Sequence, residues 1–313
     1  MDSITESPIL KFNPNTLEDV RKELNLHQEG ALKELINNFE DWISKQNHFK
    51  KKQFDRDYLE VSIIYAKGSL EKAKNTLEKL CTLKTLLPEY FAKHDVVNEF
   101  HDISEYMPHA TLPKLSKDNY RLFLLRMMSL NFTPEMFFDF QRFFVLMSEY
   151  AKCHDYSFGI TVVLDCRDIN ILNFVTKINV LDLRNCMSVL TEGYGLRLKG
   201  IHFISSSKSI EAFVSILKQI LSAKLGGRIQ VHKTLDTLYD HVTREVLPQE
   251  YGGKELSLRE VHENWRQELS RKENVEFFKE ICQAGTDEKY RLTEKYNDSV
   301  LGMPGSFRTF NVD

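Results

Sequence analysis

Hydrophobic and polar positions follow a helical period over the first hundred residues. Two helices are expected, one from Thr16 to about residue 27 and one over about residues 29–45. A third begins after Ser69, whose hydroxyl suits a helix N-terminus, and ends before Pro88. No two-residue alternation is found before about residue 119. This first part of the chain, residues 13–108, is therefore predicted to be entirely helical.

A stretch with two prolines, residues 107–113, separates this part from a different pattern. Beyond it, apolar runs typical of strands alternate with longer helical segments. The strands are expected at residues 121–127, 158–165, 201–205 and 228–232, with helices between them at 133–152 and 208–225. Strands separated by helices indicate an α/β fold with a mainly parallel sheet and crossover helices.

Three parts follow from these patterns. An all-helical N-terminal domain is predicted over residues 1–108, and an α/β domain over residues 109–254. The remaining residues, 255–313, form an extension with two charged helical segments at about 255–270 and 274–281.

Two of the predicted helices carry apolar residues over more than one narrow stripe. In the first they are Met136, Phe137, Phe138, Phe140, Phe143, Phe144 and Met147, and in the second Ile210, Phe213, Val214, Ile216, Leu217, Ile220 and Leu221. Ordinary core packing accounts for such faces and is the simpler interpretation. A helix with two buried faces can also have the sheet on one side and a ligand cavity on the other.

Composition and charge argue against several classes of protein, namely nucleic-acid-binding, secreted and membrane-spanning ones. Apolar residues make up 42% of the chain, and the formal net charge of -3 gives no bulk attraction to nucleic acid or acidic lipid. The five cysteines are odd in number and scattered, so reduced thiols in a cytoplasmic protein are expected. The first residues do not resemble a signal peptide, and no apolar run approaches the roughly 20 residues of a spanning helix.

Motifs of catalysis are absent from the sequence. It contains neither a GxSxG nor an HExxH motif, and its paired glycines lack the spacing of phosphate loops. The adjacent Cys153 and His154 point in different directions on a helix and are interpreted as accidental neighbours. No cofactor and no catalytic residue is expected.

Two polar features of the predicted sheet remain open to more than one interpretation. His202, His232 and His241 are expected to approach one another across neighbouring strands, as buried hydrogen-bonded histidines rather than as metal ligands. Asp165 ends a central strand, where α/β folds often place function. A turn or an ion pair with Arg167 is an equally good explanation.

Four basic residues are expected near one edge of the sheet. Arg197 and Lys199 share a face by strand alternation, and Lys224 and Arg228 follow the later helix. They form either a phosphate-binding patch or a scattered solvated surface.

Several motifs together resemble the CRAL-TRIO lipid-binding family, and within it the carriers of tocopherol and retinaldehyde. They are residues 193–204 (GYGLRLKGIHFI), 224–232 (KLGGRIQVH), 247–253 (LPQEYGG), 69–74 (SLEKAK) and 88–91 (PEYF). The match spans about residues 30–282, and the ending at 305–313 resembles insect members. The resemblance implies a carrier that encloses a small hydrophobic ligand between the sheet and a mobile lid helix at about residues 206–225, without catalysis.

The resemblance also assigns positions to the site. By matching, the ligand pocket is lined by Phe143, Phe144, Met147, Ile160, Val162, Leu164, Val189, Leu190, Tyr194, Leu196, Ile201, Phe213, Ile216, Leu217 and Leu221. Arg197, Lys199, Lys224 and Arg228 occupy the positions of a phosphoinositide head-group patch. The expected partners are a small hydrophobic ligand and, in transient peripheral contact, acidic membranes; nucleic acid is not expected, and the protein is expected to be a monomer.

Some positions depart from the family pattern. Residues 62–67 replace an arginine-rich stretch, which removes one basic partner of the patch, and Gln219 stands where a proline is common in the lid. Leu196 replaces the glutamate of members that carry phosphatidylinositol, which favours a neutral ligand such as a tocopherol, retinoid or carotenoid. The alternatives are a non-transferring scaffold with a filled pocket, or an enzyme acting on a lipid through His202 or Asp165.

Overall fold

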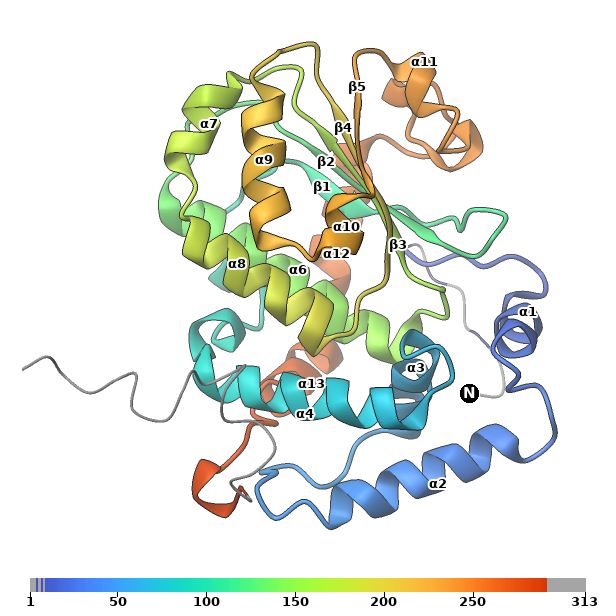
Figure 1. Ribbon diagram of the computed structural model, residues 1–313. Helices are drawn as coiled ribbons and strands as arrows, with labels where there is room; N and C mark the ends of the chain where they lie inside the picture. The colour runs from blue at the N-terminus through green and yellow to red at the C-terminus, as the bar shows by residue number, and fades with distance from the viewer. Residues whose placement is uncertain (1–3, 5–6, 8, 292–313) are drawn as a thin grey trace, which may run out of the picture.

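The computed structural model of the protein describes residues 4, 7 and 9–291, and the 305–313 ending lies outside them. Its centre is a five-stranded sheet whose strands follow one another in chain order (Figure 1). The first strand runs antiparallel to the second, and the other neighbours are parallel. The strands are β1 (His109–Thr111), β2 (Arg121–Arg126), β3 (Ile160–Asp165), β4 (Leu198–Ile204) and β5 (Ile229–His232). The predicted α/β fold with a mainly parallel sheet is confirmed.

The edge strand β1 is the one that the hydrophobic pattern does not predict. Its three residues are too few to show an alternation, and it exists because β2 offers it a partner. Ala110 pairs with Leu124 in the antiparallel register, and the backbone N–H of Leu112 donates to the Leu122 carbonyl oxygen at 2.7 Å.

The two faces of the sheet differ in what covers them. Phe123, Val162 and Ile201 are partners in register, so their side chains lie on one face. Four helices cover this face: α6 (Pro134–His154), α7 (Ile171–Lys177), α8 (Val180–Ser188) and α9 (Ile210–Ile220) (Figure 1). The opposite face carries His202 and His232 and is covered by α11 (Leu235–Leu238) and the segment after it.

The predicted helical start of the chain is confirmed. Its elements are α1 (Thr16–Glu23), α2 (Ala31–Ser44), α3 (Arg56–Tyr65), α4 (Leu70–Leu86), the 3-10 turn η1 (Pro88–Phe91) and α5 (Val96–Glu99). α1 begins at Thr16, with Asn15 at the N-cap position, and ends at Glu23, a turn earlier than predicted. Helix α3 shows no amphipathic stripe in the sequence because nearly all of its residues are buried.

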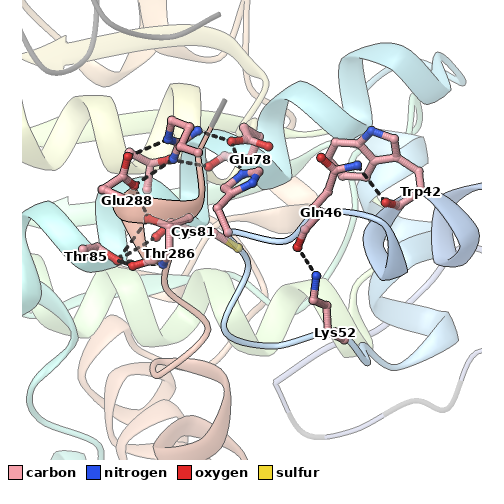
Figure 2. Close-up of polar contacts among 11 residues, drawn as sticks. Trp42, Gln46, Lys52, Glu78, Cys81, Thr85, Thr286 and Glu288 are labelled. Atoms are coloured by element: carbon pink, nitrogen blue, oxygen red, sulfur yellow. Dashed lines mark hydrogen bonds and ion pairs between the residues drawn. The ribbon is translucent and has the colours of Figure 1, made fainter. Parts of the chain in front are cut away.

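The C-terminal elements return to the helical start of the chain. They are η3 (Arg244–Val246), η4 (Gln249–Tyr251), α12 (Leu258–Leu269), α13 (Lys272–Ile281) and η5 (Glu288–Tyr290). Figure 2 shows polar contacts that join α4 to this segment: the Thr286 backbone N–H donates to Thr85 Oγ1 at 2.7 Å, and Glu78 forms an ion pair with Arg291. Both predicted charged segments are confirmed as helices.

The predicted single lid helix is wrong in one respect, since it is broken before its end. α9 stops at Ile220, Leu221 is extended (φ -83°, ψ 153°), and Ser222 caps a separate turn, α10 (Ala223–Gly226). The Ser222 side chain accepts a hydrogen bond from the Leu225 backbone N–H, which ends one helix and begins the next. Within the described residues, no helix has the length and apolar character needed to cross a membrane.

Candidate functional site

An apolar cavity of about 140 Å³ lies between the sheet and α9. Nine of the predicted pocket residues line it, namely Phe144, Val162, Leu164, Leu190, Leu196, Ile201, Phe213, Leu217 and Leu221. Its other lining residues are Phe123, Leu125, Met127, Phe137, Phe140, Gln141, Phe174, Ile178, Leu183, Cys186, Met187 and Leu198. The cavity therefore occupies the place expected between a β-layer and one helix.

Helical spacing brings the lining side chains together. On α6, Phe137, Gln141 and Phe144 follow one another at four and three residues and share the face turned to the sheet. On α9, Phe213 and Leu217 lie one turn apart. The Phe213 ring also packs against Phe174 and Phe203, with centroid distances of 5.2 and 5.6 Å.

A second, smaller cavity of about 40 Å³ continues the first toward the other end of β3. Three further predicted residues, Met147, Ile160 and Tyr194, line it. Phe144 and Leu196 line both cavities and form the partition between them. The predicted pocket is thus divided into two compartments by its own side chains.

Three predicted pocket residues line neither cavity. Phe143 points toward β1 and α12, with its ring 4.7 Å from that of His109. Val189 is fully buried in the core of the helical start of the chain, and Ile216 is half-buried on α9. Helical and strand periods predict which residues are buried, but they do not separate a cavity wall from the packed core beside it.

The lining residues that the sequence interpretation missed follow two patterns. Phe123 and Leu125 alternate along β2 on the same face as Val162 and Leu164 of β3, so the two-residue period could have found them. Phe174 and Met187 lie on the short helices α7 and α8, whose approach to α9 depends on the tertiary structure.

The electrostatic character of the cavity is neutral. Among the described residues that line it, none is acidic, basic or histidine. Burial raises the pKa of the Cys186 thiol to about 12, so it stays protonated at neutral pH. Gln141 is the most polar of the lining residues, but its amide nitrogen is buried and exposes no surface to the cavity. A charged group placed against this wall would lie there without a partner.

An open groove of about 740 Å³ adjoins the cavity at the break between α9 and α10. Its lining comes from α4, α8, η2 (Val189–Gly193) and the 220–225 segment. Met187 and Leu221 line both the groove and the internal cavity. Two flexible apolar side chains therefore separate the cavity from the surface at this point.

A basic cluster lies near the N-terminal end of β4. It includes three of the four predicted cations, Arg197, Lys224 and Arg228. The positive charge of Arg197 lowers the pKa of Lys67, with further lowering from burial, Lys224, Lys72 and Arg228. The charges of these four residues thus lie in the same region of the surface as Lys67. Lys67 and Lys72 come from the helical start of the chain, so that part contributes cations although the arginine-rich stretch is missing.

Lys199, the fourth predicted cation, has partners of its own. Its ammonium group pairs with Asp118 and lies 4.8 Å from the centre of the Tyr120 ring. Arg197 reaches the same tyrosine, with Nη2 3.5 Å from its hydroxyl oxygen. Lys199 thus lies beside the cluster, and an anion that binds Lys199 has to compete with Asp118.

The three histidines approach one another, as expected, on the face of the sheet away from the cavity. His202 Nδ1 lies 2.9 Å from His232 Nε2, and the His202 and His241 rings are 5.2 Å apart. His232 Nδ1 contacts Thr237 Oγ1 at 3.1 Å, so its ring nitrogens are already in use. In the described part of the chain, no three His, Cys, Asp or Glu residues are arranged to hold a metal ion.

Asp165 forms the ion pair considered above. Its Oδ2 lies 2.7 Å from Arg167 Nη2 and accepts a hydrogen bond from the Tyr251 hydroxyl at 2.7 Å. Burial alone would raise the pKa of Asp165, but the hydrogen bonds from Arg167 and Tyr251 outweigh it and lower the pKa. The carboxylate joins the end of β3 to the 249–251 turn, which accounts for its position.

Several known proteins are similar to parts of this chain. Two curated relatives, the alpha-tocopherol transfer protein-like proteins of Mus musculus and Homo sapiens, are each 26% identical over 126 residues, which is 40% of this chain and 36% of theirs. The chain therefore covers about a third of the length of these relatives. The solved structure of Sfh5 is similar with a TM-score of 0.40 and 14% identity, over 85% of this chain and 100% of that one. Residues 52–253 match the CRAL/TRIO domain. Because this match takes in more than half of the 313 residues and the whole sheet with its cavity, the chain belongs to the CRAL/TRIO domain family.

Proposed function

We propose that the protein is a carrier that binds one neutral apolar molecule in the cavity beneath α9 and transfers it between membranes, without catalysis. The apolar, charge-free wall of the cavity supports this proposal most directly. The names of the tocopherol transfer protein-like relatives point the same way. We expect a ligand with one polar end at most, such as a tocopherol, retinoid, carotenoid or sterol-like molecule.

Size is the property on which the proposal depends. A dry cavity of about 150 Å³ holds a molecule such as benzene, and ligand sites of drug-sized molecules span roughly 300–1,000 Å³. The two compartments, of about 140 and 40 Å³, fall below that range. A larger ligand therefore requires the Phe144 and Leu196 partition to rotate and α9 to move outward. Burying about 400 Å² of ligand surface gives roughly 10 kcal/mol before ordering costs, which is enough to drive such a movement.

The break at Leu221 and Ser222 supplies a place where α9 can pivot. The extended backbone at Leu221 interrupts the helix, so α9 can shift without unwinding its own hydrogen bonds. Since Leu221 and Met187 separate the cavity from the groove, the same movement opens a path to the surface. We propose that the ligand enters and leaves here.

The basic cluster gives the proposed carrier a membrane-facing surface. We propose that acidic head groups, phosphoinositides among them, engage Arg197, Lys199, Lys224 and Arg228 and favour the opened position of α9. Replacing these four residues with alanine should slow transfer to vesicles that contain a phosphoinositide by about tenfold or more, because each contact near an acidic surface contributes about 1 kcal/mol. Transfer is measured by following a fluorescent apolar ligand as it leaves the protein.

A matched control removes the same charge elsewhere. Its substitutions to alanine fall on the exposed lysines Lys33, Lys254, Lys272 and Lys279. This variant should transfer at the normal rate, and both variants should keep nearly normal ligand affinity. Equal slowing in the two variants, or loss of affinity with loss of transfer, would contradict the separate roles of cavity and cluster.

Organic extraction of the native protein followed by mass spectrometry tests the proposal as a whole. We expect one neutral apolar molecule per chain. Recovery of diacyl phospholipid as the main species would refute a neutral ligand. Turnover of a bound lipid would instead indicate an enzyme.

The small volume of the cavity favours a second candidate, a scaffold whose pocket is filled by its own side chains. The Phe144 partition is the specific observation in its support. A scaffold would yield no stoichiometric lipid on extraction and would not bind small apolar probes.

A further inference from the structure

The segment before α1 forms a strap against one end of the pocket, and we define this strap as residues 9–14. Its first two residues are buried in the same core as the cavity walls, with Ile9 only 1% and Leu10 only 2% exposed. Leu10 lines the smaller compartment, whereas Ile9 lines neither of the two. A short segment distant in the chain from the sheet and α6 thus contributes one apolar residue to the pocket wall.

Leu10 lies beyond the partition when the pocket is followed from the larger compartment. Phe144 and Leu196 border both compartments, whereas Leu10, Thr111 and Trp265 border only the smaller one. Trp265 Nε1 of α12 donates a hydrogen bond to the Thr111 carbonyl oxygen of β1 at 2.8 Å, which joins two of these wall elements. The strap therefore belongs to the end of the pocket that is farther along from α9.

Hydrogen bonds hold the backbone of the strap in place. The Lys11 N–H donates to the Pro113 carbonyl oxygen at 2.9 Å, and Arg121 Nη1 donates to the Lys11 carbonyl oxygen at 2.8 Å. The guanidinium carbon of Arg121 also lies 4.7 Å from the centre of the Phe12 ring, and the buried Arg121 pairs with Asp155 at 2.9 Å. Moving the strap breaks these bonds, whereas the side chains of the partition turn without breaking any backbone bond. The strap is thus the more rigid of the two boundaries.

We infer that the strap closes the far end of the pocket and that Leu10 limits the length of the ligand that the protein accepts. This inference rests on the proposed function of the cavity. A ligand that turns the Phe144 and Leu196 partition aside enters the smaller compartment, where its leading end meets the strap. Affinity for a linear ligand should rise by about fourfold with each added methylene group until the chain reaches Leu10, and fall beyond that length. Leu10 is thus a specificity-determining residue of the proposed carrier.

A series of linear primary alcohols of increasing chain length tests this limit. Titration calorimetry identifies the chain length that binds most tightly to the unmodified protein and to each variant. Leu10→Ala removes the isopropyl group from the wall, so we expect the optimum to move up by about two carbon atoms and the affinity for the longer alcohol to rise about tenfold. Leu10→Phe enlarges the wall and should move the optimum to a shorter alcohol.

The matched control is Ile9→Ala, because Ile9 is as deeply buried in the same strap but lines neither compartment. It should leave the optimal chain length unchanged. An optimum that stays in place in both Leu10 variants, or that moves equally in Ile9→Ala and Leu10→Ala, overturns the inference and leaves the carrier proposal intact. If no alcohol binds the unmodified protein, the carrier proposal itself fails and the inference with it.

A measurement on the unmodified chain covers the case in which the Leu10 variants do not fold. The methyl resonances of Leu10 should shift when the most tightly bound alcohol is added, and stay in place with a short alcohol that fits within the larger compartment. Those of Ile9 should move with neither alcohol. Leu10 resonances that stay in place with every alcohol that binds would show that the ligand does not reach the strap, which overturns the inference.

Discussion

The two buried faces of α6 are held in different ways. One face meets the cavity through phenylalanines whose contacts have no fixed direction. The other carries Glu149, which is fully buried and lies 2.5 Å from Lys84 Nζ of α4. Glu149 also accepts hydrogen bonds from the hydroxyls of Tyr58 and Tyr194, at 3.1 and 2.7 Å. Lys84 in turn donates to the Ile281 carbonyl oxygen at 2.8 Å.

This difference explains how one helix can be both fixed and able to accept a ligand. Buried charge-assisted hydrogen bonds lose most of their strength when their geometry changes, so they hold α6 against α3, α4 and α13. Apolar contacts tolerate rearrangement at lower cost, because the rings at the cavity can turn without leaving a charge unpaired. The polar side of α6 therefore acts as the fixed support against which the cavity side can open.

The largest effect is expected when the polar support is broken. Lys84→Met leaves the carboxylate of Glu149 buried without its cation, which should lower the free energy of unfolding by about 3–5 kcal/mol. Urea denaturation measures the change. The double variant Lys84→Met with Glu149→Met should recover much of the loss. Lys79→Met is the control, because its partner Glu192 is 56% exposed and the pair contributes at most about 1 kcal/mol. If Lys84→Met loses no more free energy of unfolding than Lys79→Met does, the buried network does not hold α6 in place.

A smaller effect is expected on the cavity side. Phe144→Ala removes the partition and should lower the free energy of unfolding by about 3 kcal/mol, but it joins the two compartments. We expect the variant to bind a longer apolar probe, such as a linear alkane, more tightly than the unmodified protein does, as measured by calorimetry. Phe143→Ala, next along the helix but outside both cavities, should lose stability without gaining affinity. Identical binding by the two variants would argue against the partition.

The smallest of these effects concerns the histidines behind the sheet. Burial, and then the nearby His232 and His241, lowers the pKa of His202 from 6.5 to about 4. The folded protein keeps this ring neutral while the unfolded chain takes up a proton, so stability falls as the pH drops from 6.5 toward 4. We expect a loss on the order of 2 kcal/mol from this residue, allowing for partial access of solvent. His202→Asn should flatten the decline in denaturation experiments across this range, and an unchanged slope would contradict the assignment.

Strong local patterns allowed most of the fold to be predicted from the sequence. The apolar run at residues 160–165 and the amphipathic segments that became α2 and α4 were predicted correctly, because their side-chain types and spacing suffice to indicate a strand or a helix. β1 was not predicted, and α3 was covered only by the general prediction that residues 13–108 are helical, for opposite reasons. The first is too short to carry a pattern, and the second is too completely buried to show a polar side.

The candidate site also contains some residues that the sequence could place and others that it could not. Phe213 and Leu217 could be placed on the cavity wall because they lie one helical turn apart on a face that must be buried. Phe174 and Met187 could not, because the approach of α7 and α8 to α9 is a contact between elements that no sequence period shows. Lys67 likewise joins the basic cluster only through the approach of two distant parts of the chain.

The sequence by itself determined the order of the elements, the neutral apolar character of the inner face and the residues that bear positive charge, since these depend on side-chain type and local spacing. Only the tertiary structure decided how much empty volume remains, where Phe144 divides it, and that the helix over it breaks at Leu221. Volumes and breaks arise from the fit between elements far apart in the chain, and no local pattern encodes that fit.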